Sequence, residues 1–112
     1  MIEIKEHTES GYQPLVAYEG WRVAIANYAE RFSKEKLCRM ERHLKTDEVF
    51  ILLHGEATLL IGKERLQIPM ELGKVYNVKC GEWHALFMTP SSKVAIIEND
   101  NTCLGNTEYV DF

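Results

Sequence analysis

The stretch that decides the fold runs from Met40 to Glu56 and reads MERHLKTDEVFILLHGE. A polar segment with alternating charged side chains leads into a short turn, then into an uninterrupted apolar run over Val49–Leu53, and then into a glycine. A short apolar run bounded by turn residues indicates a strand that is covered on both faces. We therefore predict two strands joined by a turn over Lys45–Asp47, the second strand lying in the core.

The rest of the chain repeats this pattern at short intervals, with runs rich in Val, Ile, Leu, Tyr and Phe between glycine-containing turns. These runs are Trp21–Ala29, Leu37–Leu44, Ala57–Ile61, Glu64–Met70, Lys74–Lys79, His84–Met88 and Lys93–Glu98. Strands about 8–12 residues apart with glycine between them are typical of an all-β sandwich or barrel. Only Glu30–Cys38 allows a helical turn. The 112 residues suit one domain, so we predict a single antiparallel β domain over residues 1–112.

The sequence also predicts which residues of the first run share a face and where the two ends of the chain lie. In the first run, alternation puts Trp21, Val23 and Ile25 on one face. The tail Asn99–Phe112 is polar with scattered apolar residues, so we expect it to lie across the barrel surface. The N-terminal segment with Tyr12 is expected either to do the same or to pair with a second subunit.

The composition argues against several classes of partner. The chain has 13 Lys and Arg against 17 Asp and Glu, a formal net charge of -4, and its basic residues are scattered. Nucleic-acid binding needs a concentrated basic face, so none is expected. No apolar run approaches the length of a membrane span, and no signal-peptide pattern is seen, so we expect a cytoplasmic protein. The odd number of cysteines, without C-x-x-C spacing, predicts neither a disulfide framework nor a zinc ribbon.

Chemistry-bearing side chains gather in two stretches. Arg39, Glu41 and His43 are two residues apart, so a strand places them on one face. Glu48 begins the next strand, and the turn between would bring it beside His43; a one-residue shift in register would put Asp47 there instead. The second stretch, Val78–His84, places a histidine at the start of a strand just after a glycine turn. Glu98, the last charge of the closing strand, is assigned a structural role.

These two stretches resemble the two motifs of the cupin superfamily. The first family motif, H-x-H followed by a spacer, Glu, an apolar strand and Gly, reads here as Glu41-x-His43, then Glu48 and Gly55. The second, P-x-G-x-x-H, reads here as the stretch from Lys79 to His84. The resemblance covers roughly residues 39–98 and is strongest to small single-domain cupins of the cupin-2 type, mostly uncharacterised. It implies an antiparallel double-stranded β-helix, the jelly-roll or cupin barrel.

The resemblance also implies a metal site, which cupins normally build from three histidines and a glutamate. Carried over position by position, the ligands are His43, Glu48 and His84, while Glu41 stands where the first histidine would be. Two imidazoles and a carboxylate suffice for a divalent transition metal. The oxygen of Glu41 would favour manganese or iron(II), although nickel and zinc stay open. Glu41 would serve as a fourth ligand or as a general base.

Two functions stay open. The resemblance implies a metal-dependent isomerase or oxygenase acting on a small polar metabolite, such as a carbohydrate derivative, and some small cupins are described as sugar-isomerase-like. The alternative is a metal-free module that binds or senses a small molecule, with Glu41 paired to Arg39 and His43 to Glu48. In either case Arg39, Trp83 and Tyr76 are expected to line the substrate pocket. A homodimer is expected from the resemblance and because covering sheet edges protects a short barrel.

Overall fold

The structure of the protein is a computed structural model that describes residues 1–112. Ten strands make up most of the chain. They are β1 (Gly11–Tyr18), β2 (Trp21–Asn27), β3 (Arg39–His43), β4 (Glu48–His54), β5 (Ala57–Ile61), β6 (Leu66–Pro69), β7 (Val75–Val78), β8 (His84–Met88), β9 (Lys93–Asn99) and β10 (Thr107–Asp111), with two single-turn 3₁₀ helices, η1 (Glu30–Phe32) and η2 (Leu104–Asn106). No helix in the structure has the length and apolar character needed to cross a membrane.

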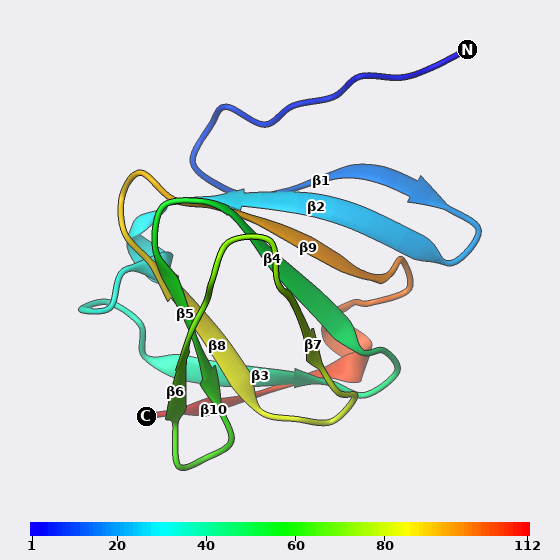
Figure 1. The fold of residues 1–112 in the computed structure, drawn as a ribbon. Coiled ribbons are helices and arrows are strands. Elements are labelled where there is room, and N and C mark those ends of the chain that lie inside the picture. Colours follow the sequence, from blue (N-terminus) through cyan, green and yellow to red (C-terminus); the bar gives the residue numbers. More distant parts are fainter.

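The strands form two five-stranded antiparallel sheets that face each other (Figure 1). The first sheet has the order β1-β2-β9-β4-β7, and the second has the order β10-β3-β8-β5-β6. Each of the predicted runs contains a strand, and the runs Ala57–Ile61 and His84–Met88 coincide with β5 and β8. The predicted all-β, single-domain antiparallel barrel is confirmed, as is the single helical turn expected before β3.

The two ends of the chain add strands that the sequence did not predict. The first, β1, pairs along the whole of β2, and β10 pairs with β3 from Thr107, opposite His43, to Asp111, opposite Arg39. The tail was expected to lie across the barrel surface, but its last part, Thr107–Asp111, instead forms an edge strand of the second sheet. Both strands are sheet edges with many exposed side chains, and an exposed edge strand needs no regular apolar alternation.

The apolar core fills one end of the space between the sheets. Its largest cluster combines aliphatic and aromatic residues of β4, β5, β8 and β9, with Phe50, Leu59 and Val94 among them, and two alanines of β2. Ala24 and Ala26 are fully buried, whereas Trp21, on the other face of β2, is 44% exposed. The face of Trp21, Val23 and Ile25 is thus the outer one, and only small side chains project inward from most of β2.

At the other end of the barrel the inward-facing rows become polar. Along β4 the inward row passes from Leu52 and Phe50 to Glu48, and along β9 it passes from Ile96 to Glu98. Strand β8 begins with a buried histidine before its apolar residues. Because the strands are in register, with Glu48 opposite Glu98, these changes occur at one level of the barrel. Buried charged groups are therefore concentrated at one end.

A candidate metal centre in the barrel cavity

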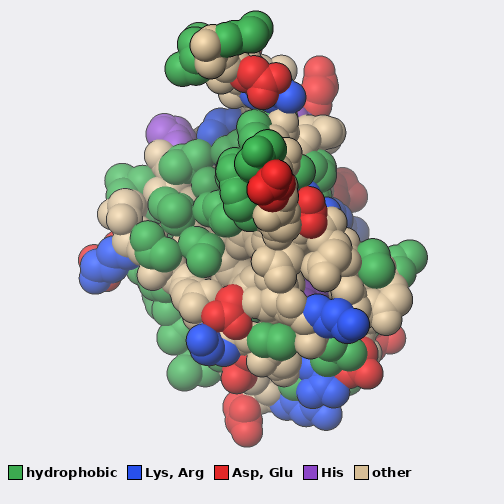
Figure 2. Space-filling view, turned by 90° about the vertical axis from the view of Figure 1, so that its right-hand side faces the viewer, with side chains coloured by type: hydrophobic (Ala, Val, Ile, Leu, Met, Phe, Trp, Pro, Cys, Tyr) green, Lys and Arg blue, Asp and Glu red, His purple; other side chains and the backbone are tan.

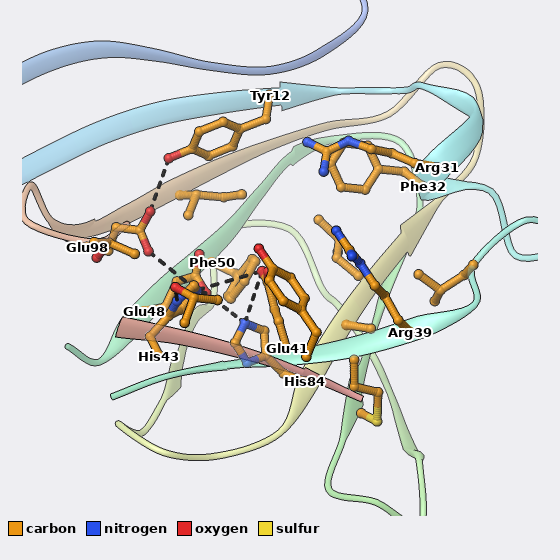
Figure 3. Close-up of a pocket in the computed structure, with 18 of the residues that line it drawn as sticks. Tyr12, Arg31, Phe32, Arg39, Glu41, His43, Glu48, Phe50, His84 and Glu98 are labelled. Atoms are coloured by element: carbon orange, nitrogen blue, oxygen red, sulfur yellow. Dashed lines mark hydrogen bonds and ion pairs between the residues drawn. The ribbon is translucent and has the colours of Figure 1, made fainter. Parts of the chain in front are cut away.

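Four side chains from three strands converge at this polar end. They are Glu41 and His43 of β3, Glu48 of β4 and His84 of β8, and the atoms that could bind a metal all lie within 4.8 Å of one another. Glu48 Oε1 lies 2.7 Å from Nε2 of His84 and 3.1 Å from Nε2 of His43. Figure 3 shows the four side chains directed toward one another. Three of them are buried, and Glu41 is half-buried.

Strand geometry explains this convergence. Alternation along β3 puts Glu41 and His43 on the same inward face, and Glu41 is the residue of β3 that pairs with His84 of β8. Glu48, the first residue of β4, points inward, whereas Asp47 points outward and accepts a hydrogen bond from the Cys80 backbone N–H at 2.8 Å. This settles which of the two acidic residues faces the barrel interior.

The outer nitrogens of both imidazoles have partners that orient the rings. His84 Nδ1 donates to the carbonyl oxygen of Glu82 at 3.0 Å, and His43 Nδ1 lies 3.0 Å from the hydroxyl oxygen of Thr107 on β10. A partner on Nδ1 holds the ring so that Nε2 faces the centre, which is how metal-binding histidines are usually supported. Thr107 had no part in the sequence prediction, because its contact depends on the unforeseen pairing of β10 with β3.

The donor set fits a divalent metal ion. His43 Nε2 is buried within ion-pair distance of Glu48 Oε1, 3.1 Å away, but it makes no hydrogen bond. Buried polar atoms are nearly always partnered, so an unpartnered nitrogen aimed at two carboxylates calls for an explanation. Two imidazole nitrogens and two carboxylate oxygens are ligands that divalent transition metals accept. These four residues are therefore the ones that would hold such an ion.

Burial and charge act against each other in this cluster. Burial favours the neutral form of Glu48, but the two imidazoles outweigh it and hold the pKa of Glu48 well below its usual range. Burial likewise opposes protonation of His43 and His84, yet contact with Glu48 raises the pKa of both imidazoles above the usual value. In the metal-free cluster Glu48 is therefore held as a carboxylate and the two imidazoles bind protons more readily than usual, so a metal ion has to compete with protons for them.

A second buried carboxylate, Glu98, adjoins the cluster. Its Oε1 accepts hydrogen bonds from the hydroxyl of Tyr12 at 3.1 Å and from Arg22 at 2.6 Å, and its Oε2 lies 3.7 Å from His43 Nε2. Burial and the charge of Glu48 raise the pKa of Glu98, although Arg22 opposes this. The sequence prediction gave Glu98 only a structural role, yet the inward alternation of β9 could have placed it at the site.

A cavity of about 470 Å³ extends from this cluster, and Figure 3 shows part of its lining. Arg39 lines the cavity, but Trp83 and Tyr76, also expected to line the pocket, are not among its lining residues. Trp83 precedes the inward-facing His84, so it points outward, and its ring lies beneath Arg42 and Lys63. Tyr76 packs against the apolar core, and its hydroxyl accepts the backbone N–H of Glu71.

No protein-family model matches the sequence, and no curated protein matches it. Solved structures share the fold. A cupin-2 domain protein from Shewanella frigidimarina has a TM-score of 0.64 and 19% identity, over 82% of this chain and 84% of that one. Streptomyces PAC13 with uridine has a TM-score of 0.68 and 10% identity, over 96% and 85%, and Pac13 is described as a nucleoside dehydratase. The iron(II) form of HppE has a TM-score of 0.55 and 20% identity, over 70% and 41%. This protein therefore has the cupin fold.

Proposed function

We propose that the protein is a divalent-metal-dependent enzyme that acts on a small polar metabolite held in the barrel cavity. The observation that carries the proposal is the convergence of two imidazole nitrogens and two carboxylates at the edge of this cavity, with His43 Nε2 unpartnered. Proteins with the same fold include a nucleoside dehydratase and an iron(II) protein. They support the idea that this fold can hold a small molecule in one protein and a metal in another.

His43, Glu48 and His84 would hold the ion, and Glu41 has a different position. Its Oε1 lies 3.7 and 3.9 Å from the two imidazole nitrogens, farther than Glu48, and its side chain is 37% exposed. When bound, a divalent ion would act as a Lewis acid toward neighbouring oxygens of the metabolite. Glu41 faces the same cavity and carries the most exposed carboxylate of the cluster, so we assign it proton transfer on the bound metabolite, which is isomerase-type chemistry.

The surrounding residues would keep this arrangement in place. Thr107 and the Glu82 carbonyl hold the two imidazole rings, and Tyr12 and Arg22 hold Glu98. Two imidazoles and one carboxylate are a ligand set that suits iron(II), and manganese, nickel and zinc would compete where they are available.

The metal content of the purified protein tests the proposal. We expect near-stoichiometric metal by elemental mass spectrometry of untagged protein prepared without chelator, and its loss in His43→Ala and His84→Ala. His54→Ala is the matched control, because His54 is exposed at a strand end and its ring binds only the Ser91 carbonyl. Wild-type protein that holds no metal, and whose melting temperature is not raised by manganese, iron, nickel or zinc, would refute the proposal.

Glu41→Gln separates the two roles of Glu41. If Glu41 transfers a proton, the variant should keep its metal and lose turnover of any substrate found by screening. If it is a fourth ligand, the variant should lose metal affinity. A variant that keeps both its metal and its turnover would remove Glu41 from the chemistry altogether.

One observation favours a metal-free binding module as the second candidate. Glu48 already accepts a hydrogen bond from His84, and Glu98 accepts hydrogen bonds from Tyr12 and Arg22, so most of the buried polar groups are satisfied without an ion. This candidate predicts ligands that raise the melting temperature of chelator-treated protein without being converted. Conversion of any such ligand would rule it out.

A homodimer and a cytoplasmic location complete the proposal. The outer face of the first sheet and its border expose apolar side chains, with Leu53 46%, Leu72 64% and Val75 65% exposed. Residues 1–6 are exposed and extend away from the barrel (Figure 1), and Figure 2 shows hydrophobic side chains gathered on the face of the molecule below this segment. Exposed apolar patches of this kind often mark subunit contacts. Sedimentation velocity should give a dimer that Val75→Asp weakens, and a monomer at all concentrations would refute the dimer.

The proposed cytoplasmic location rests on the cysteines. Three exposed free cysteines suit a reducing compartment.

A further inference from the structure

The wall of the cavity away from the buried carboxylates is basic. Three cations line the cavity: Arg31 within η1, Lys36 in the loop that follows, and Arg39 of β3. Figure 3 shows Arg31 and Arg39 on one side of the cavity, with Glu48 and Glu98 on the other. The cavity is therefore polarised, with acidic groups around the candidate metal centre and cations facing them.

These three cations have no carboxylate partner in the protein. The ion pairs of Arg and Lys are Arg22–Glu98, Arg42–Glu108, Lys74–Glu71 and Lys79–Asp47. The guanidinium groups of Arg31 and Arg39 instead lie over the rings of Phe32, at 4.4 Å, and Tyr109, at 4.0 Å. Stacking on a ring face restrains a guanidinium group and leaves its N–H donors free in the plane of the group.

This placement is unexpected in an acidic chain. The formal net charge is -4, so carboxylates to pair with these cations are abundant, yet none lies against them. All three cations are exposed, so water screens much of their mutual repulsion, but an anion between them would be attracted by each. A planar guanidinium group donates two parallel hydrogen bonds to a carboxylate or a phosphate, which a neutral sugar cannot match.

We propose that the metabolite bound in this cavity carries an anionic group, a carboxylate or a phosphate, which Arg31 and Arg39 bind with help from Lys36. With the anionic group held by the arginines at one end of the cavity, the ligand's uncharged oxygens face the candidate metal centre at the other end. This orientation rests on the proposed function, whereas the binding of the anion by the arginines does not.

The strand geometry also indicates the length that the ligand has to span. Arg39 and Glu41 project from the same face of β3, two residues apart, which along a strand is about 6.6 Å. A molecule that reaches from the arginine wall to Glu41 therefore needs to be no longer than a small sugar acid or sugar phosphate. The proposal thus narrows the substrate class from polar metabolites to small acidic ones.

Matched pairs of charged and neutral ligands test this inference by isothermal titration calorimetry. The probes are glucose 6-phosphate against glucose, and galacturonate against galactose, each titrated into metal-loaded and into chelator-treated protein. We expect at least one acid to bind about tenfold or more tightly than its neutral partner, as for hydrogen bonds to a charged group. The pair that responds identifies the anion as phosphate or carboxylate.

Variants then assign the preference to the arginine wall. The double variant Arg31→Gln/Arg39→Gln should lose the preference for the acid while keeping its metal content. Lys63→Gln, which removes an exposed cation outside the cavity, should leave the preference unchanged. Equal binding of acid and neutral partner in both pairs, or a preference that persists in the double variant, overturns the inference. Absence of metal in the wild type would instead count against the proposed function, since the preference is also measured in chelator-treated protein.

Discussion

The ion pair between Arg22 and Glu98 provides a quantitative test of the electrostatics described above. Arg22 Nη2 lies 2.6 Å from Glu98 Oε1, and the Glu98 side chain is only 4% exposed. Arg22→Met keeps an apolar stem in place and removes the charge. Glu98 then stays buried opposite Glu48, its neighbour on β4, without its ion pair and with only the His43 imidazole, 3.7 Å away, to offset its charge. Leaving one partner of a buried ion pair unpaired is strongly destabilising, whereas the intact pair contributes little net stability.

Proton uptake sets the upper limit of this destabilisation. An ordinary glutamate has a pKa of 4.5, so keeping it neutral at pH 7 costs about 2.5 pH units at about 1.36 kcal/mol each, or about 3.4 kcal/mol. An unpaired carboxylate that costs more than this takes up a proton instead. We therefore expect Arg22→Met to lower the free energy of unfolding by about 2–3.4 kcal/mol at about pH 7.

The same reasoning fixes the direction of the pH dependence. A carboxyl group whose pKa is raised in the folded state destabilises the fold as pH rises above the unfolded value, and that destabilisation fades as pH falls. At about pH 5.5 the limit is only about 1.4 kcal/mol. Urea unfolding of chelator-treated protein at both pH values measures the difference between variant and wild type.

The matched control is Arg22→Met in a Glu98→Gln background. There the loss should be small and independent of pH, because no buried carboxylate remains to be neutralised. A loss that is equal at both pH values, or as large in the Gln background, would show that Arg22 acts through packing and that Glu98 is not under electrostatic stress.

Three other perturbations have defined outcomes. Gly55→Ala should lower the urea midpoint more than Gly73→Ala. Both glycines have a positive φ, which costs about 1 kcal/mol in each variant. A Cβ on Gly55 would also lie 2.7 Å from the Ser92 Cα, whereas a Cβ on Gly73 would meet open space. Overpacking should add about 1–3 kcal/mol at Gly55, and equal midpoints would contradict this. Asp47→Asn should lower the melting temperature near neutral pH and lose this effect in acid. Backbone and side-chain donors hold the pKa of Asp47 at about 2, below the ordinary 3.8, so the stabilisation by the carboxylate disappears as pH falls through that window. A difference in melting temperature that persists at low pH would contradict this explanation. The rise in melting temperature on adding manganese should shrink from about pH 8 to about pH 6, since protons compete for imidazoles whose pKa values are raised, and a constant rise would mean that manganese binds elsewhere.

The sequence predicted the strands that have at least one face covered by other parts of the protein. The run from Val49 to Leu53 is an interior strand of the first sheet, between β9 and β7, but only its inward row, Phe50 and Leu52, is buried, and Leu53 on the outer face is 46% exposed, so the expectation of cover on both faces was wrong. Strands β1 and β10 escaped prediction because an edge strand is stabilised mainly by its backbone pairing, which leaves little trace in side-chain pattern. The inward face of β2 was also not obvious, because it carries Ala24 and Ala26 while larger apolar residues face outward.

The candidate site was partly predictable for a similar reason. The spacing of Glu41, His43 and Glu48 along one turn is local, and the glycine before His84 marks the start of its strand. The contacts of Glu98 and Thr107 depend on which strands lie side by side, and single-sequence patterns do not specify that. Trp83 was expected in the pocket because of its size, but its position next to His84 turns it to the opposite face.

The second sheet is unevenly joined at the place where the site lies. In the first sheet, β4 and β9 pair along most of their length. In the second sheet, β3 meets β8 through the single residue pair Glu41–His84. Three of the four candidate ligands sit on these two weakly joined strands. A bound ion would therefore cross-link β3 to β8, where the second sheet has the fewest paired residues. Binding of the ion would make β3, and β10 that pairs with it, more rigid. Slower amide exchange in those two strands would report it directly.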